Sequence, residues 1–326
     1  MTAPNTTTPG LPASAGVLVL GEALVDCFDS GPQPGGAPFN VARSLAALGV
    51  PVLLITRIAA SDEAGELVLS SARQFGLTDA GIQRDADHAT GTVTVEQTGA
   101  AHRFIIHGDA AWDHLDLAQA RSALANFNPA LVYFGTLAQR SPTSRDTLRT
   151  LLQETRALRY LDLNLRDGPD NQRLAEGSLA LADWLKVNDE ELDQLLVWFV
   201  HPGLPAAAWG TPAHQQALSA LVHKFQLQRL LVTRGANGYA SFDVLGACEA
   251  EGAGIADVRL VDTVGAGDAF SAAAIAAHLT GLKSGAALEL ANRFAAAICA
   301  VRGPMPQHIE FFDSWRLMPG LTEVKK

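Results

Sequence analysis

Short runs of hydrophobic residues alternate with longer amphipathic segments along most of the chain. The runs that predict strands are residues 17–20, 52–58, 131–136, 159–165, 184–187 and 229–233. Helical spacing occurs between them, for example in residues 39–48, 143–158 and 213–225. Strands alternating with helices are typical of a mostly parallel sheet with helices on both faces. We therefore expect an α/β fold whose functional side chains follow the carboxyl ends of the strands.

One segment breaks this alternation. Residues 90–97 and 102–109 each alternate apolar and polar side chains, and the sequence TGAA at 98–101 joins them. This pattern predicts a β-hairpin instead of a strand–helix–strand unit. Because no helix is available to cover its face, we expect a small β lid at about residues 88–109. The alternative is an edge hairpin packed on the main sheet.

The pattern predicts one large domain preceded by a short tail. Residues 1–15 are rich in Thr and Pro and predict a disordered tail, which leaves residues 16–326 for the domain. The cysteines Cys27, Cys248 and Cys299 are odd in number and far apart, so we expect free thiols in a reducing compartment. No basic leader and no membrane-length apolar run are present, which favours a cytoplasmic protein.

Charge narrows the possible partners. The formal net charge is −10 and no basic run stands out, so we expect neither nucleic acid nor a membrane surface as partner. A small molecule remains the expected partner. An uncovered hairpin face also makes a homodimer through the lids a possibility.

The segment DTVGAGDAF at residues 262–270 raises a chemical question. The run at 258–261 predicts a strand before it, and residues 269–279 predict a helix after it. A glycine turn before a helix N-terminus attracts anions through exposed backbone N–H groups. Asp268 stands at the same place, where its carboxylate would repel an anion. Either Asp268 only caps the helix, or the anion is present only during a reaction.

The second reading accounts for the whole segment. A phosphoryl group in transfer develops charge that the amides of the turn Gly265, Ala266, Gly267 and Asp268 can stabilise. A carboxylate beside it can take the proton from an attacking hydroxyl. The segment therefore indicates a kinase that acts on a hydroxyl group, with Asp268 as base.

Other motifs are absent. The sequence has no GxxxxGK[ST], GxSxG or HExxH segment, and GAGDAF lacks the third glycine of a dinucleotide fingerprint. A nicotinamide-dependent dehydrogenase, which shares the strand–helix alternation, is therefore disfavoured.

DTVGAGDAF resembles the signature of the ribokinase-like (PfkB) family of carbohydrate and nucleoside kinases. Further segments resemble the family's motifs in the same order: GEALVD (21–26), GGAPFNVARSLAALG (35–49), LDLNLR (161–166), KVNDEEL (186–192) and LLVTRGANG (230–238). Leu163 stands where Pro is usual. The resemblance covers residues 17 to about 307 and implies a ribokinase-like fold.

The resemblance also implies roles for individual residues. It places Asp26, Gly35, Gly36, Asn40, Phe104 and Asn164 at the sugar, and Arg166 at the transferred phosphate. It places Asn188, Thr233, Gly235, Gly238 and Asn292 at ATP, with Mg²⁺ held through water by Asn188 and Glu191. It makes a K⁺ site conceivable near Asp262, Val264 and Gly303.

Simpler readings of these residues stay open. The glycines at 35–36 can be a plain helix start, Arg166 a surface ion pair and Asn188 a helix cap. Asp26 can be a solvated loop carboxylate at the end of a strand. Asn292, on an apolar helix, can make an ordinary core hydrogen bond instead of contacting adenine.

The substrate is suggested by three segments that resemble the fructokinase branch: GEALVD, GGAPFN and GDAAWDHL (108–115). Related 2-keto-3-deoxygluconate kinases often have an Arg in the lid for the acid group, where this chain has His107. That favours a neutral sugar such as fructose, although Arg103 keeps a sugar-acid kinase as an alternative. A nucleoside kinase, or a non-catalytic sugar or nucleotide sensor on the same fold, are further alternatives.

Overall fold

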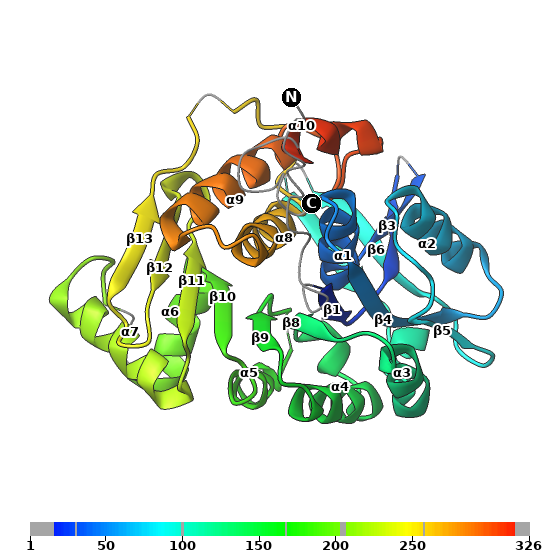
Figure 1. Cartoon of the computed structure of the whole chain (residues 1–326), viewed down its shortest axis with the longest axis horizontal. Helices are drawn as coiled ribbons and strands as arrows, with labels where there is room; N and C mark the ends of the chain where they lie inside the picture. Colours follow the sequence, from blue (N-terminus) through cyan, green and yellow to red (C-terminus); the bar gives the residue numbers. More distant parts are fainter. Residues whose placement is uncertain are drawn as a thin grey trace, which may run out of the picture.

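The central layer of the protein is a nine-stranded sheet with the strand order β13-β12-β11-β10-β9-β8-β1-β4-β5. The computed structural model describes residues 16–29, 31–98, 101–166, 168–202, 207–256 and 258–316 (Figure 1). The expected tail at 1–15 lies outside these residues. The strands are β1 (Gly16–Leu20), β4 (Val52–Ala59), β5 (Ile82–Asp85), β8 (Pro129–Phe134), β9 (Leu158–Asp162), β10 (Trp184–Asn188), β11 (Arg229–Thr233), β12 (Tyr239–Phe242) and β13 (Cys248–Gly252).

Seven neighbouring strands of this sheet run parallel, in the order β11, β10, β9, β8, β1, β4 and β5. Strands β12 and β13 form an antiparallel edge. The expected mostly parallel sheet is therefore confirmed. Each strand of the centre is buried on both faces. In β1, for example, Val17 and Val19 face one hydrophobic core and Leu18 and Leu20 face the other.

Helices cover both faces of the sheet (Figure 1). One face carries α1 (Ala37–Ala47), α2 (Glu63–Gln74), α8 (Ala266–Leu279) and α9 (Ser284–Ile298), with α10 (Asp313–Arg316) near the end of the chain. The other carries α3 (Leu117–Leu124), α4 (Pro142–Glu154), α5 (Asn171–Leu179), α6 (Asp189–Phe199) and α7 (Pro212–Phe225). Within the described residues, no helix is both long enough and apolar enough to cross a membrane.

A second, four-stranded sheet lies apart from the central one, in the order β3-β2-β6-β7. Its strands are β2 (Leu24–Phe28), β3 (Gly31–Gly35), β6 (Gly91–Thr98) and β7 (Ala101–Ile106). We call it the small sheet. The predicted hairpin is present as the antiparallel pair β6–β7. It does not pair with the central sheet, so the edge-hairpin alternative is wrong.

Two sequence expectations are corrected by the structure. Asp26 was expected to follow the carboxyl end of a strand, but residues 24–35 form the hairpin β2–β3, in which Asp26 is the middle residue of β2, whereas the helix expected after Gly36 is present as α1. Residues 258–261 were expected as a strand, but they are irregular. Leu260 is 66% exposed and Val261 is 46% exposed, so this apolar run does not enter the core.

Candidate active site

A cavity of about 410 Å³ lies between the small sheet and the carboxyl ends of the central strands. Apolar side chains of the small sheet form one wall, among them Leu24, Val93 and Phe104. The opposite wall includes the first turn of α8. Of the residues expected to act, those that line the cavity are Asp26, Gly36, Asn40, Phe104, Asn164, Arg166, Asn188, Glu191, Thr233, Val264, Gly265, Gly267 and Asp268.

Asp268 lies in the first turn of α8 and is only 9% exposed. Helix α8 is capped by Gly265 without any side-chain cap bond, so the interpretation of Asp268 as a plain helix cap is wrong. Asn40 Nδ2 donates to Asp268 Oδ2 at 2.8 Å, and Arg43 donates to the other atom of that amide, Asn40 Oδ1. Arg43 is itself fixed by Ser71 Oγ at 2.8 Å. The carboxylate of Asp268 is therefore held in one orientation.

The electrostatic environment makes Asp268 a stronger base than an ordinary carboxylate. Burial raises its pKa most, the neighbouring Asp162 raises it further, and Asn40, Lys186 and Arg166 lower it. The pKa of Asp268 is thereby raised to about 6. A group with this pKa is ionised at neutral pH and still accepts a proton readily.

The turn before α8 is built on glycine. Gly265 has φ +81°, and a Cβ there would lie 2.5 Å from the carbonyl oxygen of Pro304. The amide of Ala266 donates to the carbonyl of Thr263 at 3.2 Å, so it is occupied by the turn itself. The amides of Gly267 and Asp268 follow in the first turn, where helical N–H groups have no intrahelical acceptor. They are the donors that an anion at this helix end would meet.

A buried ion pair beneath this turn was missed by sequence reasoning. Lys186 Nζ lies 3.0 Å from Asp162 Oδ1, and the side chains are almost fully buried. Ser271 Oγ donates to Asp162 Oδ2 at 2.8 Å. Burial lowers the pKa of Lys186, but the surrounding carboxylates, Asp162 first, outweigh it and raise that pKa. A Cβ on Gly267 would lie 2.9 Å from Lys186 Nζ, which places the ammonium next to the helix N-terminus.

Two carboxyl groups stand on the other side of the cavity. Asp26 projects from β2 toward Gly35, where a Cβ would lie 2.1 Å from Asp26 Oδ2, and burial raises its pKa to about 6. Glu22 was not singled out from the sequence. It is buried, its pKa is raised to about 7 mainly by desolvation, and its Oε2 has no hydrogen-bond partner among the described residues. Gly36 passes close to the backbone of Glu22 with φ +102°.

Asn164 and Arg166 follow β9 at the mouth of the cavity. Asn164 has φ +43°, and its Oδ1 accepts a hydrogen bond from Arg166 Nη1 at 2.7 Å. This hydrogen bond holds the guanidinium beside Asn164, and both residues line the cavity. Leu163, in the place of the usual Pro, is buried and its amide donates to the carbonyl of Lys186 at 3.0 Å, a bond that Pro could not make.

Asn188 and Glu191 form a reciprocal capping box at the start of α6. The Asn188 amide donates to Glu191 Oε2 at 2.9 Å, and the Leu165 amide donates to Glu191 Oε1 at 2.8 Å. The capping interpretation is therefore correct. Each carboxylate oxygen of Glu191 has a second lone pair, and both residues line the cavity, which fits water-mediated contact with Mg²⁺.

The expected nucleotide residues lie at the end of β11 and beyond. Thr233 lines the cavity, and the following turn η3 (Gly235–Asn237) leads into Gly238, which has φ +90°. A Cβ on Gly238 would lie 1.9 Å from the carbonyl oxygen of Gly252. Asn292 was expected to be buried, but it is half-exposed and donates to the carbonyl of Ala253 at 2.9 Å.

The residues expected near K⁺ come together through one side chain. Asp262 Oδ1 accepts from the amide of Val264 at 3.0 Å, and Asp262 Oδ2 accepts from the amide of Gly303 at 3.0 Å. Asp262 thus joins the two loops, because each of its carboxylate oxygens accepts a hydrogen bond from a backbone amide.

Comparison with known proteins places this arrangement in a family. The sequence pattern of pfkB family carbohydrate kinases matches residues 18–309. A fructokinase from Escherichia coli is 29% identical over 83% of this chain and 85% of its own length. A 2-dehydro-3-deoxygluconokinase from E. coli is 24% identical over 88% of this chain and 96% of its own length. A match to a sugar kinase from Pyrococcus horikoshii, at 29% identity, spans 54% of that relative.

Solved structures show the same fold. The uncharacterized P. horikoshii sugar kinase in complex with ATP superposes with a TM-score of 0.72 at 24% identity, covering 94% of this chain and 99% of that one. A Vibrio cholerae fructokinase double mutant with fructose, ADP and potassium bound has a TM-score of 0.71 at 23% identity, covering 91% and 95%. The sequence match over most of the chain is decisive: this chain belongs to the pfkB family of carbohydrate kinases.

Proposed function

We propose that this carbohydrate kinase transfers the γ-phosphoryl group of ATP to a hydroxyl of a neutral sugar, with fructose as the preferred acceptor. The observation that carries the proposal is the placement of Asp268. A buried carboxylate with a raised pKa stands in the first turn of α8, inside a cavity that the small sheet partly closes. The first turn of α8 thus contains both the carboxylate that can act as base and the backbone amides of Gly267 and Asp268 that can bind an anion.

The positions of the cavity residues support the following roles. Asp268 accepts the proton of the sugar hydroxyl, while Asn40 holds its Oδ2 and keeps the carboxylate aimed at the cavity. The amides of Gly267 and Asp268 and the guanidinium of Arg166 stabilise the charge on the transferring phosphoryl group. The small sheet acts as a lid that excludes water, which would otherwise compete as acceptor.

ATP is proposed to lie along the β11 end of the sheet. Thr233 is at the cavity edge, and the turn of Gly235 and Gly238 allows a ligand to approach the backbone. To contact adenine, Asn292 would either exchange its hydrogen bond with the carbonyl of Ala253 or accept a hydrogen bond from the base through Oδ1. Mg²⁺ at Asn188 and Glu191 would supply neutralisation of the phosphate charge, and K⁺ would lie near the loops that Asp262 joins.

Electrostatics favour a neutral sugar over a sugar acid. Four carboxyl groups line the cavity, those of Glu22, Asp26, Glu191 and Asp268, and the ionised ones would repel a substrate carboxylate. His107, which stands where an acid-binding Arg was considered, follows β7, is exposed and contacts Thr94 Oγ1 at 2.9 Å. The side chain of Arg103 lies outside the described part of the structure. Hydroxyl groups, in contrast, can donate to the unpartnered oxygen of Glu22.

The test is ADP release from Mg-ATP with a panel of acceptors, with and without K⁺. Fructose is expected to give a kcat/KM well above those of 2-keto-3-deoxygluconate, other sugar acids and nucleosides. Turnover confined to sugar acids or nucleosides would contradict the assignment of fructose as substrate but would be compatible with the proposed mechanism. ATP binding without turnover on any acceptor would favour the sensor alternative.

The pH dependence provides a separate prediction. A carboxyl whose folded-state pKa is about 6 is protonated below that pH and cannot accept a proton. We therefore expect kcat/KM for the sugar to be level near neutral pH and to fall through pH 6, by up to about tenfold per pH unit. The measurement is kcat/KM from pH 5 to 8, with circular dichroism confirming the fold at each pH. A profile that stays level down to pH 5 would argue against Asp268 as the base.

A further inference from the structure

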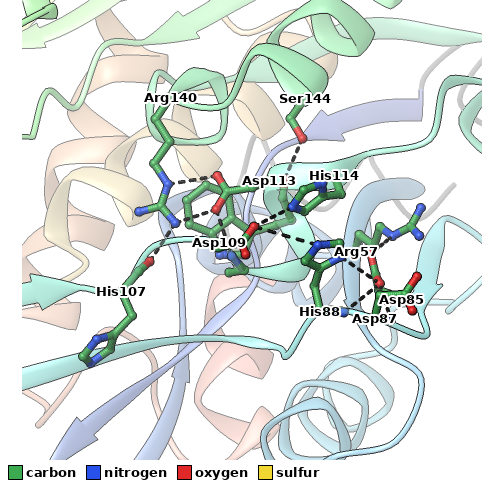
Figure 2. A network of polar contacts seen from close by, with 12 residues as sticks. Arg57, Asp85, Asp87, His88, His107, Asp109, Asp113, His114, Arg140 and Ser144 are labelled. Atoms are coloured by element: carbon green, nitrogen blue, oxygen red, sulfur yellow. Dashed lines mark hydrogen bonds and ion pairs between the residues drawn. The ribbon is translucent and has the colours of Figure 1, made fainter.

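A cluster of two histidines and an aspartate lies at the root of the β6–β7 hairpin, separate from the residues that line the cavity (Figure 2). His88 precedes β6 and Asp109 follows β7, so the two ends of the hairpin meet here. His114 ends the short helix η1 (Ala111–His114) and comes from a third segment. Among the described residues, this is the group whose His, Cys or carboxylate atoms are near enough together to hold a metal ion, all lying within 4.8 Å of one another.

The distances suit a small coordination sphere. His114 Nε2 lies 2.9 Å from Asp109 Oδ1, and His88 Nε2 lies 3.8 Å from the same oxygen. Tetrahedral Zn²⁺ with bonds of about 2.0–2.1 Å separates its ligand atoms by roughly 3.3 Å. The two imidazoles are stacked with ring centroids 3.6 Å apart. Because the lone pairs lie in the ring planes, the two rings would have to rotate out of this stacked arrangement to bind one ion.

His88 is oriented as a metal ligand would be. Its Nδ1 lies 3.1 Å from Asp85 Oδ1, and Asp85 is a buried carboxylate whose other oxygen accepts from Arg57 Nε at 2.6 Å. In the tautomer with its proton on Nδ1, the hydrogen bond to Asp85 leaves the lone pair on Nε2, as in a metal-bound histidine. That Nε2 is the nitrogen that faces Asp109.

The third segment is also fixed in place. Arg140 donates to both carboxylate oxygens of Asp113, the neighbour of His114, at 2.9 and 2.7 Å. The same guanidinium donates to the carbonyl of His107 at 2.7 Å, which joins η1 to the end of β7 (Figure 2). Asp109 itself has φ +55°, a left-handed conformation. The three candidate ligands are therefore presented by segments that are tied together by other residues.

The donor atoms of the cluster face one another. The Nε2 atoms of His88 and His114 lie 3.8 and 2.9 Å from Asp109 Oδ1. Neutral imidazoles and a carboxylate each offer a lone pair to a cation. A cation between these atoms accepts all three lone pairs. Imidazole nitrogens select Zn²⁺ and its transition-metal neighbours over Mg²⁺ and Ca²⁺, which prefer all-oxygen sites.

We propose that His88, Asp109 and His114 form a binding site for a divalent transition metal, which joins both ends of the β6–β7 hairpin to η1. Water completes the coordination sphere, because Asp109 is 80% exposed. Asp85 acts through His88 as a positioning residue. The site lies outside the cavity and does not rest on the proposed sugar or on the phosphoryl transfer.

The direct test is titration of the chelator-treated protein with Co²⁺, followed by visible absorption. The wild-type chain is expected to bind one Co²⁺ with a d–d spectrum of nitrogen and oxygen ligands. His88→Ala and His114→Ala should each weaken binding at least about tenfold, and Asp85→Asn about 10- to 100-fold. His223→Ala removes an exposed histidine of α7 and should leave binding unchanged. Mg²⁺ should not displace the bound Co²⁺.

A second measurement guards against loss of folding in the histidine variants. Zn²⁺ at about 100 times its Kd should raise the Tm of the wild-type chain by a few degrees and should not raise that of Asp109→Ala. Asp109 is largely exposed, so its replacement should leave the fold intact. Absence of a Co²⁺ spectrum in the wild-type chain would overturn the proposal. So would equal Co²⁺ binding by wild type and His114→Ala, or an equal Zn²⁺ effect on Asp109→Ala.

Discussion

Replacing Asp268 by Asn is expected to lower kcat by about 10²- to 10⁴-fold, the usual contribution of a positioned general base. The amide has nearly the shape of the carboxylate but cannot take the proton of the sugar hydroxyl. Its nitrogen would also meet Asn40 Nδ2, which now donates to Asp268 Oδ2 at 2.8 Å, unless Asn40 turns over. KM for ATP should change little, because the carboxylate acts on the acceptor. The measurement is steady-state kinetics with saturating sugar and ATP.

Asp116→Asn is the matched control. Asp116 caps α3 by accepting from the amide of Gln119 at 2.8 Å, so its replacement also changes an aspartate at the start of a helix. It does not line the cavity, and kcat should stay as in the wild type. A kcat of Asp268→Asn within tenfold of wild type, with a native circular dichroism spectrum, would contradict the assignment of Asp268 as base.

Replacing Lys186 by Met is expected to lower the free energy of unfolding by about 3–5 kcal/mol, the typical effect of removing one partner of a buried ion pair. Asp162 would be left charged and fully buried, with Ser271 and Tyr133 as its remaining donors. Activity should fall as well, because Lys186 Nζ stands beside the backbone of Gly267 at the helix N-terminus. Urea unfolding followed by circular dichroism measures the first effect.

The double variant Lys186→Met with Asp162→Asn separates the two contributions. It removes both charges, so most of the lost stability should return, while the activity that depends on the ammonium should not. Arg121→Met, which breaks the exposed ion pair with Glu154, is the control and should leave the unfolding midpoint unchanged. Equal unfolding midpoints of Lys186→Met and wild type would show that the buried pair contributes nothing to folding.

The sequence indicated six of the nine strands of the central sheet, because those six are short apolar runs separated by segments with helical spacing. It did not indicate β5, β12 and β13, which are short and less apolar. It did not indicate the hairpin β2–β3, since the segment GPQPG at 31–35 has no alternation of apolar and polar residues. It placed a strand at 258–261, where the side chains turn out to be exposed. Burial of an apolar run depends on the rest of the fold and cannot be read from the run itself.

The site was predictable where its residues stand in motifs and less so where they depend on partners distant in sequence. The GAGD turn brings Gly267 and Asp268 together within one helical turn. The pairing of Lys186 with Asp162 joins two strands, although a Lys within the apolar run WLKV was a sign of a buried charge that needs a partner. Glu22 gave no such sign, because only the folded chain shows that its carboxyl group is desolvated and unpartnered.

The most direct test of the central claim is a competition at limiting Mg-ATP between equimolar fructose and 2-keto-3-deoxygluconate, with products identified by ³¹P NMR and mass spectrometry. The cavity is lined by the carboxyl groups of Glu22, Asp26 and Asp268, so a neutral acceptor should be preferred. The proposed function therefore predicts a fructose phosphate as the main product. A phosphorylated sugar acid as the main product would contradict the preference for a neutral acceptor. Inorganic phosphate alone, with neither sugar modified, would contradict the proposed transfer to these sugars.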